Sequence, residues 1–253
     1  MLVYAHRGSS GTEPENTLRA FKRAIDDGAD GIEFDVHATA DGVPVVIHDR
    51  SLARTTTGEG LVNELTLEQV RSFDAGGGQP VPTLVEVLDV VAGRLRLDIE
   101  VKQPGIAGLV LEVLSNYPAA EWVIGSFNWS ILEEIRALAP SAKLRPIANQ
   151  PTEEAFASAR ALGATAISLR ADTVTPEIAQ RIFAEDLDLV VWTVNRVEDA
   201  KRARHLGASA LCTDMPGEII RGLATDMMPT QSVPEQHTSP AAAGQLATAP
   251  NLR

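Results

Sequence analysis

The feature that most constrains the fold is a repeated alternation of two kinds of segment. Short runs rich in β-branched residues alternate with longer segments whose apolar residues recur at helical spacing. This alternation is typical of repeated βα units that build a parallel sheet. The runs predict strands near residues 2–5, 31–36, 95–101, 122–126, 143–147, 166–169, 187–193 and 210–212. Helices are expected near residues 17–27, 84–91, 106–116, 130–139, 152–162, 176–185, 197–206 and 216–223.

Eight units of this kind favour an α/β fold of the (β/α)8 barrel type over an open doubly wound sheet. Periodicity alone does not establish that the sheet closes. Helix-end signals support the boundaries, because Gly28, Gly163 and Gly207 each follow a helical run, where glycine can adopt the left-handed conformation. Thr83 and Glu86 have the spacing of a capping box at the start of a helix.

Two segments depart from the alternation. Residues 43–79 form a connection too long for a simple βα loop, with a short helix expected near residues 67–72. Residues 224–253 are rich in Pro, Ala, Thr, Ser and Gln without periodicity, which predicts a disordered tail. We therefore expect one domain over residues 1–223, with an insertion at 43–79.

Composition excludes several classes of function. A net charge of −12 disfavours a nucleic-acid partner, which would need a basic face. No run approaches the roughly 18 apolar residues of a membrane span, and no secretory signal is visible, so we expect a cytoplasmic protein without stable membrane association. Cys212 is the single cysteine and lies in an apolar run, as expected of a small core residue.

Acidic residues alternate with apolar ones on two predicted strands. Glu33 and Asp35 share one face of the strand predicted at residues 31–36. Glu100 lies on the strand predicted at residues 95–101. The inner face of a barrel is crowded, so carboxylates gathered there would repel one another without a cation. Oxygen ligands suit one divalent cation, Mg²⁺ or Ca²⁺. The alternative is that these residues are surface carboxylates on a half-exposed strand.

Two histidines and two basic residues occur near these acids, at the ends of apolar runs. Three carboxylates, two imidazoles, an Arg and a Lys are the parts of a metal-assisted phosphoryl-transfer site. The basic and imidazole members are His6, Arg7, His48 and Lys102.

The ordered set of motifs resembles that of the glycerophosphodiester phosphodiesterase family. The similar segments are His6-Arg7-Gly8, Pro14-Glu15-Asn16-Thr17, Glu33-Phe34-Asp35-Val36, His48-Asp49, Ile99-Glu100-Val101-Lys102, Pro82-Thr83-Leu84, Gly125-Ser126-Phe127, Trp192-Thr193-Val194-Asn195 and Thr213-Asp214-Met215-Pro216. The resemblance implies a closed barrel and places the insertion over the barrel mouth. It also implies hydrolysis of a small glycerophosphodiester to an alcohol and glycerol 3-phosphate.

The resemblance implies a role for each group. His6 and His48 would be the catalytic acid and base, in an order that the sequence leaves open. Arg7 and Lys102 would bind the phosphate, although Lys102 has the alternative of a structural ion pair with Glu100 or Asp98. The sequence also leaves open whether the cation is Mg²⁺ or Ca²⁺. It does not decide whether water attacks the phosphodiester directly or a cyclic phosphate intermediate forms first.

Further residues are expected around the pocket. Glu15 is expected to orient Arg7, and Asn16 either supports the site or caps the first helix. Asp49 either orients His48 or caps the loop, and Trp192 either forms a pocket wall or packs in the core. The expected pocket or supporting residues are Glu15, Asn16, Asp49, Phe127 and Trp192. His37 shares the face of Glu33 and Asp35 but matches no family catalytic position.

Two other functions stay open from the sequence. One is a lipid phosphodiesterase similar to lysophospholipase D or a phosphoinositide phospholipase, which would need an exposed apolar or basic rim. The other is a non-catalytic phosphate-binding barrel, which intact histidines and acids disfavour. The leaving alcohol and the oligomeric state are not predicted.

Overall fold

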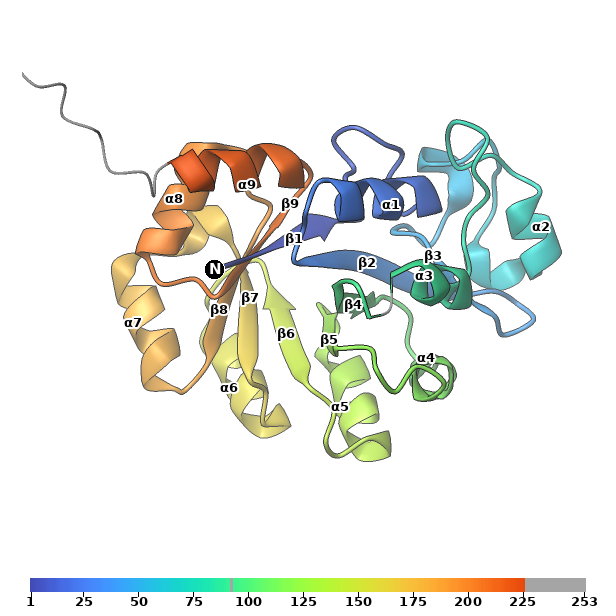
Figure 1. Ribbon diagram of the computed structural model, residues 1–253. Helices are drawn as coiled ribbons and strands as arrows, with labels where there is room; N and C mark the ends of the chain where they lie inside the picture. The colour runs from blue at the N-terminus through green and yellow to red at the C-terminus, as the bar shows by residue number, and fades with distance from the viewer. Residues whose placement is uncertain (92, 226–253) are drawn as a thin grey trace, which may run out of the picture.

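The strands form a closed parallel barrel. The structure is a computed structural model that describes residues 1–91 and 93–225. Its parallel strands are β1 (Leu2–His6), β2 (Gly31–Ala38), β4 (Arg96–Val101), β5 (Trp122–Ser126), β6 (Leu144–Ala148), β7 (Ala166–Arg170), β8 (Asp188–Trp192) and β9 (Ala210–Thr213). β1 pairs with both β2 and β9, which closes the sheet (Figure 1). The predicted (β/α)8 barrel is therefore confirmed.

Helices surround the barrel and bury the outward faces of the strands (Figure 1). They are α1 (Leu18–Asp26), α3 (Leu84–Val91), α4 (Ala107–Ser115), α5 (Trp129–Leu138), α6 (Glu153–Leu162), α7 (Pro176–Ala184), α8 (Val197–His205) and α9 (Pro216–Thr225). The expected capping box begins α3, since the Thr83 backbone N–H donates to Glu86 Oε2 at 2.8 Å and the Glu86 N–H donates to Thr83 Oγ1 at 3.2 Å. Gly28, Gly163 and Gly207 all have positive φ, as predicted.

The alternation along β2 decides which side chains face the barrel interior. Ile32 and Phe34 are fully buried in the core cluster under the helices, and the Phe34 ring meets the Phe21 ring of α1 edge to face at 5.9 Å. Glu33 and Asp35 must then lie on the opposite face, toward the barrel axis. A buried helix–sheet layer thus fixes the direction of two acidic side chains.

The insertion is a small unit beside the barrel mouth. It contains β3 (Pro44–Val46), which pairs antiparallel with β2, the 3₁₀ helices η1 (Leu52–Arg54) and η2 (Val62–Glu64), and α2 (Leu67–Arg71). Its buried residues form a separate apolar cluster, together with Val81 just after the insertion; the insertion's members are Val45, Ile47, Leu52, Val62, Val70 and Ala75. In Figure 1 it lies beside α1 and α3. The expected helix near residues 67–72 is present, whereas β3 was not predicted.

The carboxyl-terminal boundary differs slightly from the expectation. α9 extends to Thr225, so residues 224 and 225 belong to a helix and not to the predicted tail. The rest of that predicted tail, including His237, lies outside the described residues. In residues 1–91 and 93–225, no helix is long and apolar enough to cross a membrane.

Candidate active site

The connection from β1 to α1 adopts an unusual backbone. Arg7 and Asn16 have φ of 57° and 56°, values that non-glycine residues seldom adopt. The Arg7 N–H donates to the Glu33 carbonyl at 2.8 Å, and the Asn16 N–H donates to the Arg7 carbonyl at 2.9 Å. These bonds hold the two strained residues against the end of β2. Strain of this kind tends to occur at functional sites, where surrounding structure enforces it.

Three carboxylates meet inside the barrel. Glu33, Asp35 and Glu100 each offer an oxygen, and these oxygens lie within 4.8 Å of one another. Asp35 and Glu100 are register partners on adjacent strands, and the three residues are only 6 %, 1 % and 7 % exposed. The structure thus brings together the three acids that strand parity predicted.

The cluster is electrostatically uneven. Burial, together with the negative charges of neighbouring carboxylates, raises the pKa of Glu33 well above its ordinary value. Burial and the charge of Asp35 likewise raise the pKa of Glu100 to about 7. Burial would also raise the pKa of Asp35, but the nearby cations Lys102 and Arg7 outweigh it and lower that pKa. One carboxylate therefore ionises readily, while the other two need further positive charge.

The oxygen atoms around the cluster suit a hard cation. Among the described residues, buried Asp35 Oδ1 and Asn16 Oδ1 have no hydrogen-bond donor. Asn16 Nδ2 donates to Asp35 Oδ2 at 3.0 Å, while Thr17 and not Asn16 caps α1. The capping alternative for Asn16 is therefore wrong, since its side chain serves the acidic cluster. Buried acceptors without donors and an all-oxygen set are what Mg²⁺ or Ca²⁺ would fit.

His6 is held by an acid from the far end of the chain. Its Nδ1 lies 2.6 Å from Asp214 Oδ1, and its Nε2 lies 3.9 Å from Glu33 Oε2. Ser10 Oγ and Asn195 Nδ2 also donate to Asp214. Burial would raise the pKa of Asp214, but the His6 hydrogen bond and charge outweigh it, so that the pKa falls to about 2. The sequence places Asp214 in a motif after the last strand but does not indicate its partner His6, which lies 208 residues away.

His48 has a matching arrangement in the insertion. Its Nδ1 lies 2.5 Å from Asp49 Oδ1, so Asp49 orients His48. Its Nε2 lies 3.2 Å from Lys102 Nζ and must accept there, because an ammonium only donates. Burial lowers the pKa of His48. The carbonyl of His48 also accepts from His37 Nε2 at 3.2 Å, so His37 touches the backbone near the site.

Lys102 and Arg7 both contact Asp35, each at a different carboxylate oxygen. Lys102 Nζ is 2.8 Å from Glu100 Oε1 and 3.4 Å from Asp35 Oδ1. Arg7 Nη1 donates to Glu15 Oε1 at 2.9 Å, as expected, and its Nε lies 3.3 Å from Asp35 Oδ2. The suggested ion pair of Lys102 is therefore present with Glu100, whereas its pairing with Asp98 is wrong.

The carboxylate of Asp98 is engaged elsewhere. It pairs with Arg145, which projects from β6 and is 3 % exposed. Nothing in the sequence around Arg145 signals this pair, because the residue sits in mid-strand outside any motif.

These groups line a cavity of about 260 Å³ at the carboxyl ends of the strands. One wall is charged and includes His6, Arg7, Glu33, His48 and Glu100. The lining also includes Phe127 and Trp192, whose rings meet edge to face at 5.4 Å. Phe127 is 40 % exposed, so the cavity has an aromatic part as well as a charged one. The wall alternative for Trp192 thus has geometric support, and buried Cys212 lines the same cavity from β9.

Comparison with known proteins decides the family. The model of the glycerophosphoryl diester phosphodiesterase family matches residues 6–218. A glycerophosphodiester phosphodiesterase of Caldanaerobacter subterraneus subsp. tengcongensis is 37 % identical over 233 residues, covering 87 % of this chain and 96 % of that protein. The chain belongs to the glycerophosphoryl diester phosphodiesterase family. It is therefore an enzyme of the phosphoric diester hydrolase class, as the motif resemblance implied.

Solved structures of glycerophosphoryl diester phosphodiesterases and related enzymes share the fold. A phosphodiesterase of Oleispira antarctica, solved with its product sn-glycerol-3-phosphate, has a TM-score of 0.85 at 27 % identity. The match covers 88 % of this chain and 97 % of that one. A glycerophosphodiester phosphodiesterase of Agrobacterium tumefaciens has a TM-score of 0.78 at 26 % identity, covering 87 % and 99 %.

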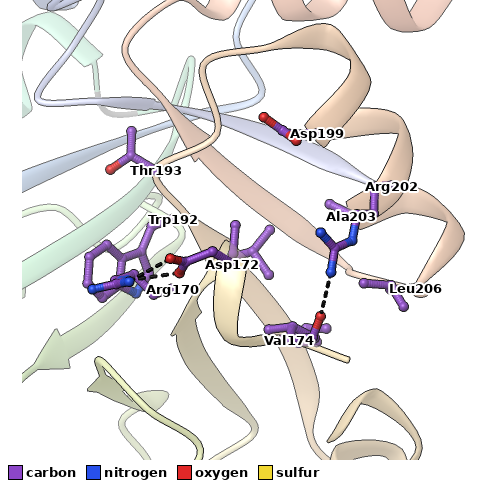
Figure 2. Close-up of a pocket in the computed structure, with 12 residues that line it drawn as sticks. Arg170, Asp172, Val174, Trp192, Thr193, Asp199, Arg202, Ala203 and Leu206 are labelled. Carbon is purple, nitrogen blue, oxygen red and sulfur yellow. Dashed lines mark hydrogen bonds and ion pairs between the residues drawn. The ribbon is translucent and has the colours of Figure 1, made fainter. Parts of the chain in front are cut away.

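A larger cavity in this member of the family is lined by neither the acidic cluster nor His6 and His48. It has a volume of about 460 Å³ and lies between the connection after β7 and α8, sharing Trp192 and Thr193 with the active-site cavity (Figure 2). Its guanidinium groups are engaged, since Arg170 pairs with Asp172 and Arg202 donates to the Val174 carbonyl. Glu33, Glu100, His6 and His48 line the smaller cavity instead.

Proposed function

We propose that this chain is a divalent-cation-dependent enzyme that hydrolyses glycerophosphodiesters to an alcohol and glycerol 3-phosphate. The observation that carries the proposal is the group of three buried carboxylates within 4.8 Å of one another, two of which, Glu33 and Glu100, line a cavity together with His6 and His48. The product bound in the Oleispira antarctica relative supports the same substrate class. Glu33, Asp35 and Glu100 would hold the cation, which when bound polarises the phosphoryl group and lowers the pKa of a bound hydroxyl or water.

Arg7 and Lys102 bind and orient the phosphoryl group. The Arg7 guanidinium can face two phosphate oxygens at once, whereas the Lys102 ammonium acts as a point charge. Both cations are already held against Asp35, at 3.3 Å and 3.4 Å, so little reorganisation is needed when charge develops on the phosphoryl oxygens.

The two histidines that line the cavity move the protons. His48 has a lowered pKa and lies beside the Lys102 ammonium, which favours a neutral imidazole that can accept a proton as the base. His6 Nδ1 is held by Asp214 at 2.6 Å, and its Nε2 lies on the side of the acidic cluster, 3.9 Å from Glu33 Oε2, so Nε2 is the atom that would protonate the leaving oxygen. Phe127 and Trp192 would contact the organic part of the substrate and exclude water.

The insertion argues against a lipid substrate. Leu52 and Val62 are fully buried, and Leu65 and Phe73 pack against the same small cluster. Apolar residues that fill the insertion's own core leave no continuous apolar rim to meet a membrane.

Substrate selection tests the proposal directly. The chain would be incubated with glycerophosphocholine and, separately, with lysophosphatidylcholine, and glycerol 3-phosphate and choline would be measured. We expect glycerophosphocholine to give both products in equal amounts. Turnover of the lysolipid alone would favour the lipid enzyme, and binding of glycerophosphocholine without turnover would favour the non-catalytic barrel.

A further inference from the structure

The guanidinium of Arg54 connects the β1–α1 connection with the insertion, although Arg54 does not line the active-site cavity. Arg54 ends η1 in the insertion, anchored by the neighbouring buried Leu52. Its Nη1 and Nη2 donate to Glu15 Oε2 and Oε1, each at 2.8 Å. Its Nε and Nη2 donate to Asp49 Oδ2 and Oδ1 at 2.7 Å and 3.2 Å. The planar guanidinium therefore binds two carboxylates, Glu15 along its Nη1–Nη2 edge and Asp49 along its Nε–Nη2 edge.

Each of these carboxylates also holds a residue of the proposed mechanism. Glu15 Oε1 accepts from Arg7 Nη1 at 2.9 Å, and Asp49 Oδ1 lies 2.5 Å from His48 Nδ1. The contacts form one continuous series from Arg7 through Glu15, Arg54 and Asp49 to His48. Glu15 comes from the β1–α1 connection and Asp49 from the insertion, so Arg54 connects two separate segments of the chain.

We propose that Arg54 is a positioning residue that fixes the phosphate-binding Arg7 and the base His48 relative to each other. The role rests on the proposed function, since it matters only if Arg7 and His48 act on one substrate. Arg54 does not line the active-site cavity, so it acts through Glu15 and Asp49.

The chemistry of the side chain explains why an arginine is needed. Guanidinium presents five donors in a rigid fork that can meet carboxylates bidentately, whereas ammonium is a compact point charge. Alternating charges along the series keep Glu15 and Asp49 ionised and close together. Without the cation the two carboxylates would repel, and both Arg7 and His48 would lose a fixed partner.

The structure separates positioning from stability. The Arg54 side chain is 45 % exposed, and exposed ion pairs contribute little to folding. Arg71 provides a matched control in the same insertion. Its Nη1 pairs with Glu86 Oε2 at 2.5 Å across to α3, with the side chain 32 % exposed, away from the catalytic residues.

The test compares Arg54→Gln, Arg54→Lys and Arg71→Gln in steady-state hydrolysis of glycerophosphocholine. We expect Arg54→Gln to lower kcat by about 10- to 100-fold, the usual cost of a misplaced catalytic group, with a smaller change in KM. Arg54→Lys should recover only part of kcat, because it restores charge without the fork. Arg71→Gln should keep native kcat, and all three variants should keep the native melting temperature.

A second measurement is independent of turnover. The ¹⁵N and ¹H NMR signals of the His48 ring report the Nδ1–H group, whose hydrogen bond Asp49 accepts. We expect this signal to broaden or vanish in Arg54→Gln and to persist in Arg71→Gln. Native kcat and an unchanged His48 signal in Arg54→Gln would overturn the positioning role. Absence of turnover in the native chain would instead contradict the proposed function, and the NMR comparison would still decide the role of Arg54.

Discussion

At the scale of single residues, the site is defined by how each imidazole is held. His6 and His48 both use Nδ1 to meet a carboxylate, Asp214 and Asp49, at 2.6 Å and 2.5 Å. A carboxylate at Nδ1 fixes the tautomer and the ring orientation and leaves Nε2 for proton transfer. The two residues differ in their other neighbours, because Glu33 faces His6 and Lys102 faces His48.

That difference predicts distinct behaviour for the two alanine variants. His6→Ala and His48→Ala should each lose about 10²- to 10⁴-fold in turnover of glycerophosphocholine. A nitrophenyl ester of glycerol phosphate needs no proton to release its leaving group. On that substrate His6→Ala should recover and His48→Ala should not. The opposite pattern would exchange the roles of acid and base, and near-native turnover in both variants would make the imidazoles structural.

The acidic cluster predicts that cation binding releases protons. Glu33 and Glu100 have raised pKa values, the latter about 7, so near neutrality they hold protons that a cation must displace. Affinity for Mg²⁺ or Ca²⁺ should therefore increase as the pH rises through about 7. Calorimetric titration in two buffers of different ionisation enthalpy counts the protons. A constant affinity and no released proton between pH 5 and pH 8 would contradict the raised pKa values.

The same shifts set the pH dependence of stability without added cation. A carboxyl group whose pKa is higher in the folded chain binds more protons folded than unfolded. For Glu100, the stabilisation of the folded chain by this proton is fully present below pH 4.5, the ordinary pKa of a glutamate. It is lost as the pH rises through the folded-state pKa of about 7. We expect the added cation to raise the melting temperature more at pH 8 than at pH 5. An equal increase in melting temperature at pH 5 and pH 8 would contradict the raised pKa of Glu100.

Sequence reasoning found the residues whose position is fixed by strand parity or by a motif. Glu33 and Asp35 had to share a face because strand side chains alternate, and the parallel pairing of β2 with β4 places Glu100 beside Asp35. Asp214 and Arg54 gained their partners only through tertiary contacts spanning 208 and 39 residues. No local pattern reports such contacts, so the sequence could not assign these two residues a role.

At the scale of elements, the β1–α1 turn positions the site, and Gly8 is the residue that lets it form. Gly8 has φ of 80°, and a Cβ there would lie 2.6 Å from the Ala20 carbonyl carbon of α1. Gly28 offers a control, since φ is 78° but an added Cβ would meet no described atom within 4 Å. The two positions separate backbone strain from a steric clash.

Gly28→Ala should cost about 1 kcal/mol of unfolding free energy, the penalty of left-handed backbone alone. Gly8→Ala should cost at least twice that, about 2–3 kcal/mol, because α1 must also shift. Urea unfolding of the two variants checks the difference. Equal losses would show that α1 moves away freely and that the close packing of this turn is unimportant.

The regular elements were predictable to within about two residues, because long βα units repeat a strong pattern. β5 begins and ends where the sequence placed it, as does α3. β3 escaped detection because three residues are too few for a period-2 pattern. The insertion's arrangement likewise depends on its own small core, which its sequence spacing does not reveal.

At the scale of the whole molecule, the barrel joins residues from the two ends of the described chain. β1 pairs with β9, and this pairing places Asp214 beside His6. Because closure and α9 are complete by Thr225, a chain ending there should keep the native melting temperature and turnover. A large loss of either on removing residues 226–253 would show that those residues support the barrel.

The central claim is that the three buried carboxylates hold a divalent cation needed for phosphodiester hydrolysis. The most direct measurement is turnover of glycerophosphocholine after a chelator has removed divalent cations, followed by addition of Mg²⁺ or Ca²⁺. The account predicts that turnover disappears and then returns in the native chain. A Glu33→Gln, Asp35→Asn double variant should stay inactive at every cation concentration. Full turnover in the chelator, or in the double variant, would contradict it.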